Sequence, residues 1–174
     1  MIATTAATPR AVVLGVGNVL FSDEGLGPQA IAQLERGFEA PPRLALIDGG
    51  TSAMELLDDM ANADLLLIVD AIAHGAAPGS LIVLEGEQVP RFFTHRLSPH
   101  QVGLSDVLAT LALADESPRE TVIIGVEPAS LAMGMELSPT VAATLPALLD
   151  AVRERLRRFG LPLSARRPAA AVAA

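Results

Sequence analysis

The chain of 174 residues contains no cysteine. This absence excludes disulfide bonds, thiolate metal sites, iron–sulfur clusters and a cysteine nucleophile, so a metal would have to bind oxygen and imidazole ligands. Positive charge is also scarce, because 12 basic residues face 20 acidic ones and leave a net charge of −8. We therefore expect no nucleic-acid groove and no binding to an anionic membrane surface.

Long apolar runs and common catalytic signatures are missing as well. No run approaches the roughly 20 residues of a membrane span, and the first residues, MIATTAATPR, lack the apolar core of a signal peptide. The HExxH helix, the glycine-flanked serine elbow and the P-loop are absent. We expect a cytoplasmic protein without membrane insertion that uses none of these familiar hydrolase or kinase arrangements.

The length and the apolar fraction of 51% predict one well-buried domain over residues 1–160. The segment after Gly160 is small, basic and interrupted by proline. We expect residues 161–174 to form a flexible C-terminal tail.

Short apolar runs alternate with helix patterns along the chain. The runs predict strands at residues 11–16, 43–48, 64–70, 80–86 and 121–126. The periodic segments predict helices at 26–38, 52–60, 104–114 and about 140–159, and a capping box from Ser52 to Glu55 opens the second of them. Because several runs are apolar at every position, both faces of the sheet should be covered. The predicted fold is α/β, with a three-layer, open, mainly parallel twisted sheet of about five strands and helices on both faces.

Acidic residues follow the early predicted strands. Asp23 and Glu24 come after the first strand, Asp48 ends the second and Asp70 ends the third. Taken singly, each acid is more simply explained as a turn or helix cap. Asp70 is the sharpest exception, because it ends five consecutive apolar residues and so lies too deep for a surface cap. A buried carboxylate needs a positively charged partner.

One histidine completes a candidate metal site. We expect His100 in a loop before the 104–114 helix, where it would meet Glu24 and Asp70 at the carboxyl edge of the sheet. Two carboxylates and one imidazole leave coordination positions open, as catalytic metal sites do. This set suits zinc, nickel, manganese or iron better than calcium. We expect His74 and His95 to be ordinary exposed residues.

The glycine motifs are less specific. GVGNVL has two of the three glycines of a dinucleotide fingerprint and Leu20 at the third position, so we expect the close helix packing and the open helix N-terminus of that fold to be missing. The DGG sequence, Asp48 to Gly50, fits a tight turn or a site equally well. Glu127 also ends a strand, but we leave it out of the site.

Four sequence blocks in order resemble the hydrogenase maturation endopeptidases, in particular those that process uptake nickel–iron hydrogenases. The blocks are GVGNVLFSDEGLG, DGGTSAMELL, LLLIVDAI and SPHQVGLSDVL, and the resemblance spans about residues 11 to 150. It implies an α/β enzyme that removes a short C-terminal peptide from the hydrogenase large-subunit precursor after nickel insertion. It also implies that nickel is carried by the precursor, and that other divalent metals such as zinc can bind in vitro.

By motif, the metal-site residues of that family match Glu24, Asp70 and His100, and the family's DGG block places Asp48, Gly49 and Gly50 along the cleft. The sequence leaves open whether a carboxylate such as Asp70 or a metal-bound water activates the attack. Two other interpretations also stay open: a nucleotide- or metal-binding module on a Rossmann-like sheet, and a peptidase of the same fold with a different substrate.

Overall fold

The computed structural model describes residues 10–93 and 99–166 of the chain. Its main sheet has five strands in the order β3-β1-β4-β6-β5. The first four run parallel and β5 is antiparallel to β6. The strands are β1 (Ala11–Val16), β3 (Leu44–Gly50), β4 (Leu65–Ala71), β5 (Leu81–Glu85) and β6 (Thr121–Val126). These bounds confirm the five predicted strands.

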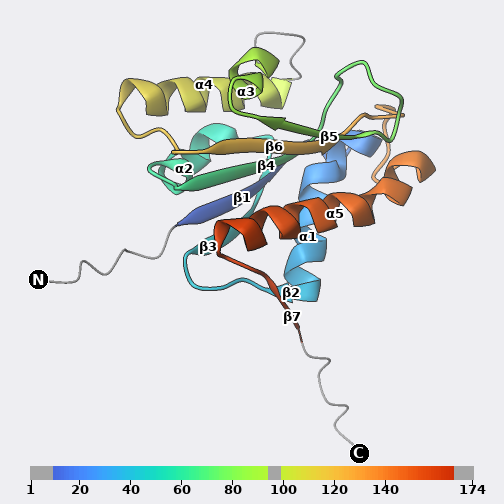
Figure 1. The fold of residues 1–174 in the computed structure, drawn as a ribbon. Helices are drawn as coiled ribbons and strands as arrows, with labels where there is room; N and C mark the ends of the chain where they lie inside the picture. Colours follow the sequence, from blue (N-terminus) through green and yellow to red (C-terminus); the bar gives the residue numbers. More distant parts are fainter. Residues whose placement is uncertain (1–9, 94–98, 167–174) are drawn as a thin grey trace, which may run out of the picture.

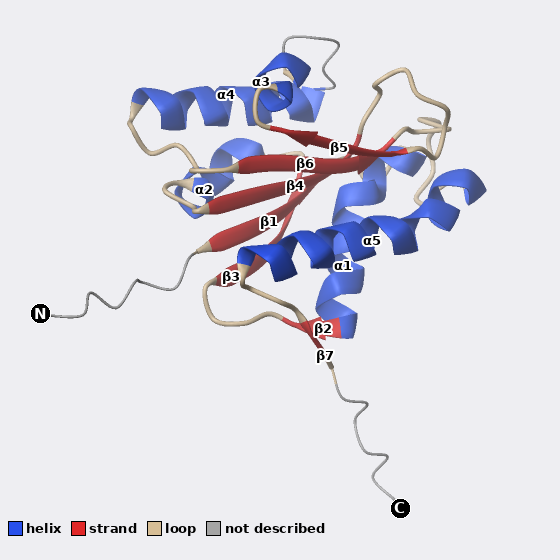
Figure 2. Ribbon diagram, in the orientation of Figure 1, coloured by secondary structure: helices blue, strands red, loops and turns tan. Residues whose placement is uncertain are grey.

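Helices cover both faces of this sheet (Figures 1 and 2). One face carries α1 (Leu26–Gly37) and α5 (Pro139–Phe159), and the other carries α2 (Leu57–Met60), α3 (Gln88–Phe92) and α4 (Pro99–Leu113). The three-layer α/β fold is therefore confirmed. Within the two described ranges, no helix is both long and apolar enough to cross a bilayer.

The unbroken apolar runs of the sequence bury residues on both faces of the sheet. In β1, Ala11 and Val13 join the core under α1 and α5, whereas Val12 and Leu14 join the core under α2, α3 and α4. All seven residues of β4 are buried, Asp70 among them. The edge strand β5 instead alternates buried and exposed residues, as expected for a strand with one face toward solvent.

Two predicted helices begin differently from the prediction. The segment predicted as a helix at 52–60 is a short 3₁₀ helix, η2 (Ala53–Leu56), followed by α2, and the Ser52 side chain caps neither. The predicted capping box is wrong, because the Glu55 N–H donates to the backbone carbonyl of Ser52 and not to its hydroxyl. Helix α4 begins at Pro99 rather than at residue 104. Proline suits the first helical position, where its missing N–H has no intrahelical partner to lose.

Helix α5 closes the fold much as the sequence predicts. The Ser138 side chain accepts the Val141 N–H at its N-terminus, and Gly160 ends it in the left-handed conformation at φ 88°. Beyond it, Leu161 is buried in the core, and β7 (Ser164–Ala165) pairs with β2 (Phe38–Glu39) in a second, two-stranded sheet. The packed chain thus continues past residue 160, and residues 167–174 of the predicted tail lie outside the described residues.

Candidate active site

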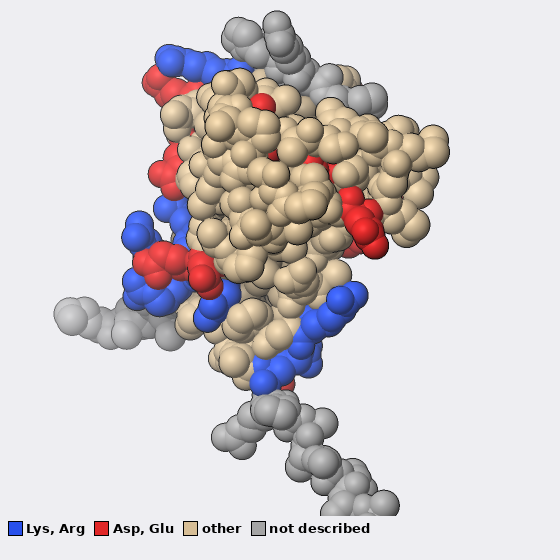
Figure 3. Space-filling view, turned by 90° about the vertical axis from the view of Figure 1, so that its right-hand side faces the viewer, with Lys and Arg blue, Asp and Glu red and all other residues tan. Residues whose placement is uncertain are grey.

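The candidate site lies at the carboxyl edge of the sheet. The ends of the parallel strands β1, β3, β4 and β6 meet there, so the loops 17–25, 51–56, 72–79 and 127–138 lie at that edge. Figure 3 faces this edge and shows a broad uncharged surface with a few acidic groups, whereas arginine side chains lie around its rim. An open parallel sheet commonly binds its ligand at this edge.

Asp70 lies at the end of β4 with 1% of its surface exposed. The amide nitrogen of buried Gln101 donates to Asp70 Oδ2 at 2.5 Å and to the carbonyl oxygen of Ala71 at 3.3 Å. The depth predicted from the sequence is therefore confirmed. These contacts join the first turn of α4 to the end of β4 and fix the orientation of one carboxylate oxygen.

His100 immediately precedes Gln101 in the first turn of α4, so its predicted place in a loop is wrong. Because Gln101 reaches Asp70, the backbone turn that carries His100 lies beside the end of β4. The placement of the His100 side chain is outside the described part of the structure, as is all of His95. His74 is exposed, as predicted.

The acidic pair after β1 divides into two environments within the 3₁₀ helix η1 (Ser22–Gly25). Asp23 is fully buried, and its two oxygens accept hydrogen bonds from the backbone N–H groups of Ala129, Ser130 and Ser138 and from the Ser138 hydroxyl, at 2.7 to 2.9 Å. Asp23 therefore anchors the loop after β6 to the loop after β1. Nothing in the sequence distinguished this structural role from that of its neighbour.

Glu24 is the member of the pair that remains available. It is half-buried, and no donor among residues 10–93 and 99–166 binds its carboxylate. Its element, η1, contacts β4. A carboxylate at this edge without a structural partner can accept a proton or bind a cation.

Two glycines explain how Glu24 is placed beside β4. Gly17 adopts φ 138°, and a Cβ there would lie 1.8 Å from the carbonyl oxygen of Glu24, so only glycine permits this turn. A Cβ on Gly27, in the first turn of α1, would lie 2.3 Å from the Val16 oxygen and 2.5 Å from the Val69 oxygen. Helix α1 therefore packs closely on the strands, and the prediction that this packing is missing was wrong. The glycine that permits it, Gly27, lies outside the GVGNVL motif on which the prediction was based.

The DGG turn at the end of β3 lies against the same loop. Asp48 Oδ1 accepts the Gly50 N–H at 3.0 Å, and the Gly50 carbonyl accepts the Gly17 N–H at 2.9 Å. A Cβ on buried Gly49 would lie 2.7 Å from the Leu14 side chain. The turn therefore has a structural role, and the lining of a cleft by Asp48, Gly49 and Gly50 stays a prediction.

Glu127, at the end of β6, has a structural role. It is 8% exposed, and its Oε2 accepts the backbone N–H groups of His74 and Ala76 at 2.8 and 3.0 Å. These bonds hold the loop after β4 against β6. Nothing in this arrangement calls for Glu127 in the site.

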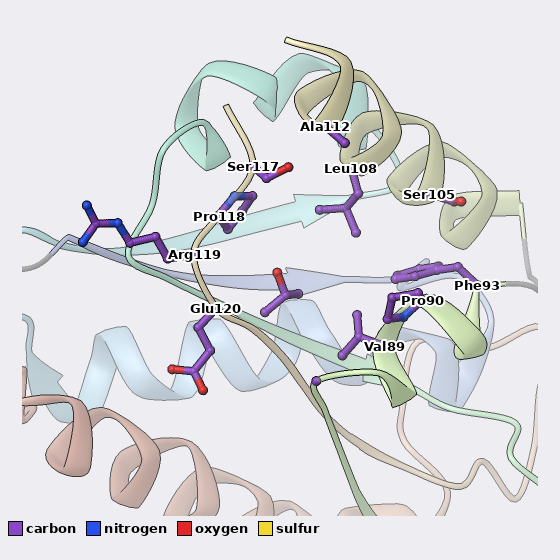
Figure 4. Close-up of a pocket in the computed structure, with 12 residues that line it drawn as sticks. Val89, Pro90, Phe93, Ser105, Leu108, Ala112, Ser117, Pro118, Arg119 and Glu120 are labelled. Atoms are coloured by element: carbon purple, nitrogen blue, oxygen red, sulfur yellow. The ribbon is translucent and has the colours of Figure 1, made fainter. Parts of the chain in front are cut away.

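A cavity of about 610 Å³ lies near the opposite edge of the sheet, between α3, α4 and the start of β6 (Figure 4). Leu108, Val89 and Phe93 line it, and the charged ends of Arg119 and Glu120 point away from these apolar groups. Arg119 pairs with Asp64, and Glu120 pairs with Arg155. Its polar groups do not converge on a common point, so we do not assign the chemistry to this cavity.

A preformed metal site is not found among the described side chains: no three histidine, aspartate or glutamate residues of that set are placed to hold one ion. The predicted trio is not decided by this result, because the His100 side chain is outside the set. Glu24, Asp70 and His100 together stay a prediction. The structure places Glu24 and Asp70 on contacting elements and the His100 backbone next to Gln101, the partner of Asp70.

The chain is similar in sequence to the hydrogenase maturation proteases. The family model described as hydrogenase maturation protease matches residues 28–155. The hydrogenase 2 maturation protease of Escherichia coli (strain K12) is 44% identical over 87% of this chain and 93% of its own length. The hydrogenase expression/formation protein HupM of Azotobacter chroococcum is 40% identical over 85% of this chain and 72% of its own.

A solved structure agrees with these matches. The hydrogenase maturating endopeptidase HybD from Escherichia coli superposes with a TM-score of 0.86 and 43% identity, covering 90% of this chain and 98% of that one. The family match, the sequence identity and the superposition therefore agree. The chain belongs to the hydrogenase maturation protease family and is a peptide-bond hydrolase.

Proposed function

We propose that this protein is a cytoplasmic endopeptidase that removes the C-terminal peptide of a nickel–iron hydrogenase large-subunit precursor after nickel insertion. The observation that carries the proposal is the arrangement of three motif-matched positions at one edge of the sheet. Glu24 lies on η1, which contacts β4, Asp70 ends β4, and His100 precedes the residue that holds Asp70.

We infer that Glu24, Asp70 and His100 bind nickel carried by the precursor, which makes the metal part of the substrate. The set fits the ion chemically, because two carboxylates and an imidazole are suitable ligands for nickel and also for zinc in vitro. At such a site, nickel would contribute polarisation of a nearby carbonyl group.

Other residues of the chain support this site by fixing it in place. Gln101 orients Asp70 through its amide, and Asp23 and Gly17 hold the backbone that carries Glu24. Because the backbone that carries these ligands is already held in place, nickel binding needs little rearrangement. The site would then bind a nickel-loaded precursor more tightly than a nickel-free one. The DGG turn, Asp48 to Gly50, is the proposed cleft wall beside it.

The nucleotide-binding alternative is disfavoured by the surroundings of α1. Its first turn packs through Gly27 against the backbones of β1 and β4, and Asp23 and Glu24 lie in η1, just before its N-cap residue Gly25. Two carboxylates before a helix N-terminus repel the phosphate groups that such a terminus would otherwise attract. Calorimetric titration with NAD should therefore give no binding, and saturable binding would revive that alternative.

The decisive experiment compares two forms of the large-subunit precursor encoded by the same organism, one loaded with nickel and one nickel-free. Each is incubated with the purified protein, and the mass of the precursor is followed by mass spectrometry. We expect loss of a C-terminal peptide from the nickel-loaded form alone. Equal processing of both forms would remove nickel from the proposal, and processing of neither would overturn it.

A further inference from the structure

The segment before η1 and the loop after β6 expose an apolar surface at the carboxyl edge. We call it the edge patch and define it as Val19, Leu20, Phe21, Leu131, Met133 and Met135. Met133 is 85% exposed, Met135 is 68% exposed and Leu20 is 54% exposed. Large apolar side chains gathered on one surface commonly mark a protein-binding site.

The backbone holds the two halves of the edge patch side by side. Phe21 and Gly134 form a parallel β-bridge, in which the Gly134 N–H binds the Leu20 carbonyl at 2.9 Å and the Ser22 N–H binds the Gly134 carbonyl at 2.7 Å. Asp23 adds its hydrogen bonds to Ala129 and Ser130. The exposed side chains therefore stand on a fixed backbone, which lowers the entropy lost on binding.

The edge patch continues into a groove between α1 and α5. Val19 and Met135 line this groove of about 560 Å³ together with Gln29 and Leu137. Its charged lining residues are Glu136, next to Met135, and Arg36, in the last turn of α1. Gln29 donates to the Met135 carbonyl at 3.1 Å and so joins α1 to the patch. The patch and the groove form one continuous surface. Its residue Phe21 lies three positions before Glu24 in the sequence.

The charge of this edge restricts the partner. The loops 17–25, 51–56, 72–79 and 127–138 contain no arginine, and the chain contains no lysine. Their ionisable residues are His74 and five acids. Asp23 and Glu127 are buried and bind backbone N–H groups, which leaves Glu24, Glu55 and Glu136 to meet a partner. Among the described residues that Figure 3 draws, the basic side chains lie around the rim. An acidic partner would be repelled, and a basic one would be attracted.

We propose that the edge patch and its groove dock a segment of the hydrogenase precursor that carries large apolar side chains flanked by lysine or arginine. This inference rests on the proposed function and adds the surface by which the substrate is recognised. Unbranched methionine side chains suit this role because they adapt their shape to the partner. The patch lies beside Glu24, so docking there brings the bound segment to the reacting groups.

The test measures KM and kcat for the nickel-loaded large-subunit precursor with wild-type protein and with the double variant Met133→Ser, Met135→Ser. We expect KM to rise about 10-fold or more and kcat to change less than about 3-fold, because the lost contacts serve binding and not the chemical step. The matched control is Leu113→Ser, which removes an 89% exposed side chain at the far end of α4 and should alter neither constant. All three substitutions affect exposed side chains, so neither variant should unfold.

A second arm tests charge. Raising the sodium chloride concentration should raise KM for the wild-type protein, and Glu136→Gln, at an exposed acid beside the patch, should reduce this salt dependence. A KM independent of salt would overturn the basic character assigned to the segment.

The outcomes separate the two proposals. Wild-type cleavage with an unchanged KM in the double variant would overturn the docking surface alone. A fall in kcat with an unchanged KM would also overturn it and would assign the loop to positioning. Wild-type dimers that dissociate in the double variant, with KM unaffected, would make the patch an interface between copies. Failure of the wild-type protein to cleave the precursor would overturn both proposals.

Discussion

The two edges of the sheet differ in how their charges are used. At the amino edge, charged groups pair with one another or with backbone: Arg155 with Glu85 and Glu120, Arg119 with Asp64, and the Arg10 guanidinium with the carbonyls of Asp59 and Ala61. At the carboxyl edge, the loops 17–25, 51–56, 72–79 and 127–138 contain no arginine, and Glu24 has no donor among the described residues. The charged groups at the first edge stabilise the fold, whereas the second edge combines structural acids such as Asp23 and Glu127 with Glu24, whose carboxylate accepts no hydrogen bond from the described residues.

Asp23 and Glu24 repeat this contrast over one peptide bond. Asp23 is fully buried and accepts hydrogen bonds from Ala129, Ser130 and Ser138, whereas Glu24 is half-buried and accepts none from residues 10–93 and 99–166. An acid at a strand end is therefore not by itself a site residue. Its hydrogen-bond partners decide whether it builds the site or acts in it.

The largest expected effect is at His100. His100→Ala should lower the rate of precursor processing by more than about 100-fold, because losing even a residue that supports a metal ligand commonly costs 10- to 100-fold. His74→Ala and His95→Ala each remove an imidazole without removing the proposed ligand and should be nearly silent. Processing is measured by the mass of the precursor. Equal activity in the three variants would remove His100 from the site.

The next effect separates Asp23 from Glu24. Asp23→Ala leaves the N–H groups of Ala129, Ser130 and Ser138 without their acceptor, so we expect the free energy of unfolding to fall by about 3 to 5 kcal/mol in urea denaturation. Glu24→Gln should lose processing activity and change stability by less than about 1 kcal/mol. A larger loss of stability in Glu24→Gln than in Asp23→Ala would mean that Glu24 has the structural role and Asp23 the functional one.

Much of the fold could be predicted from the sequence because its strands are apolar at every position. The bounds of β1, β4 and β6 follow from these runs, and so does the burial of Asp70 at the end of β4. The start of α4 could not be predicted in the same way. Its first turn is held by Gln101 binding Asp70, a tertiary contact between residues 31 positions apart.

The site was predictable at the level of its edge and less so at the level of its residues. Parallel topology places the strand-end acids together, which the sequence pattern reveals. The structural role of Asp23 depends on partners 106 to 115 positions away, which no local pattern encodes. The packing role of Gly27 was missed because it comes after an inserted 3₁₀ helix, outside the spacing of the dinucleotide motif.

A substitution at the amino edge should have the opposite profile to His100→Ala. Arg155→Ala removes a largely buried guanidinium that pairs with Glu85 and Glu120, and we expect the free energy of unfolding to fall by about 1 to 3 kcal/mol. Processing by the folded variant should match wild type, because the pair lies at the edge away from Glu24. A large loss of activity at unchanged stability would contradict the division between the edges.

A smaller effect is expected at an exposed cluster of α5. Hydrogen bonds from Arg157 and Arg158 lower the pKa of Glu154 from 4.5 to about 2. A lowered folded-state pKa adds stability above the unfolded pKa, and this stability is lost as the pH falls from about 4.5 toward 2. Glu154→Gln should therefore lower the urea midpoint slightly at pH 6, and the difference should shrink over that acidic range. Solvent screens this exposed cluster, so a large midpoint change would be unexpected.

The smallest effect is expected from removing metal. Both edges are built from packed apolar strands and from hydrogen bonds such as those of Asp23 and Glu127, and none of these contacts needs an ion. The protein purified in chelator should be largely metal-free and should keep its far-UV circular dichroism, unlike a zinc finger, whose fold depends on its metal. Elemental analysis checks the first expectation, and thermal unfolding with and without EDTA checks the second. Loss of helix and strand signal in EDTA would mean that the carboxyl edge holds a structural ion, and nickel could then no longer be treated only as part of the substrate.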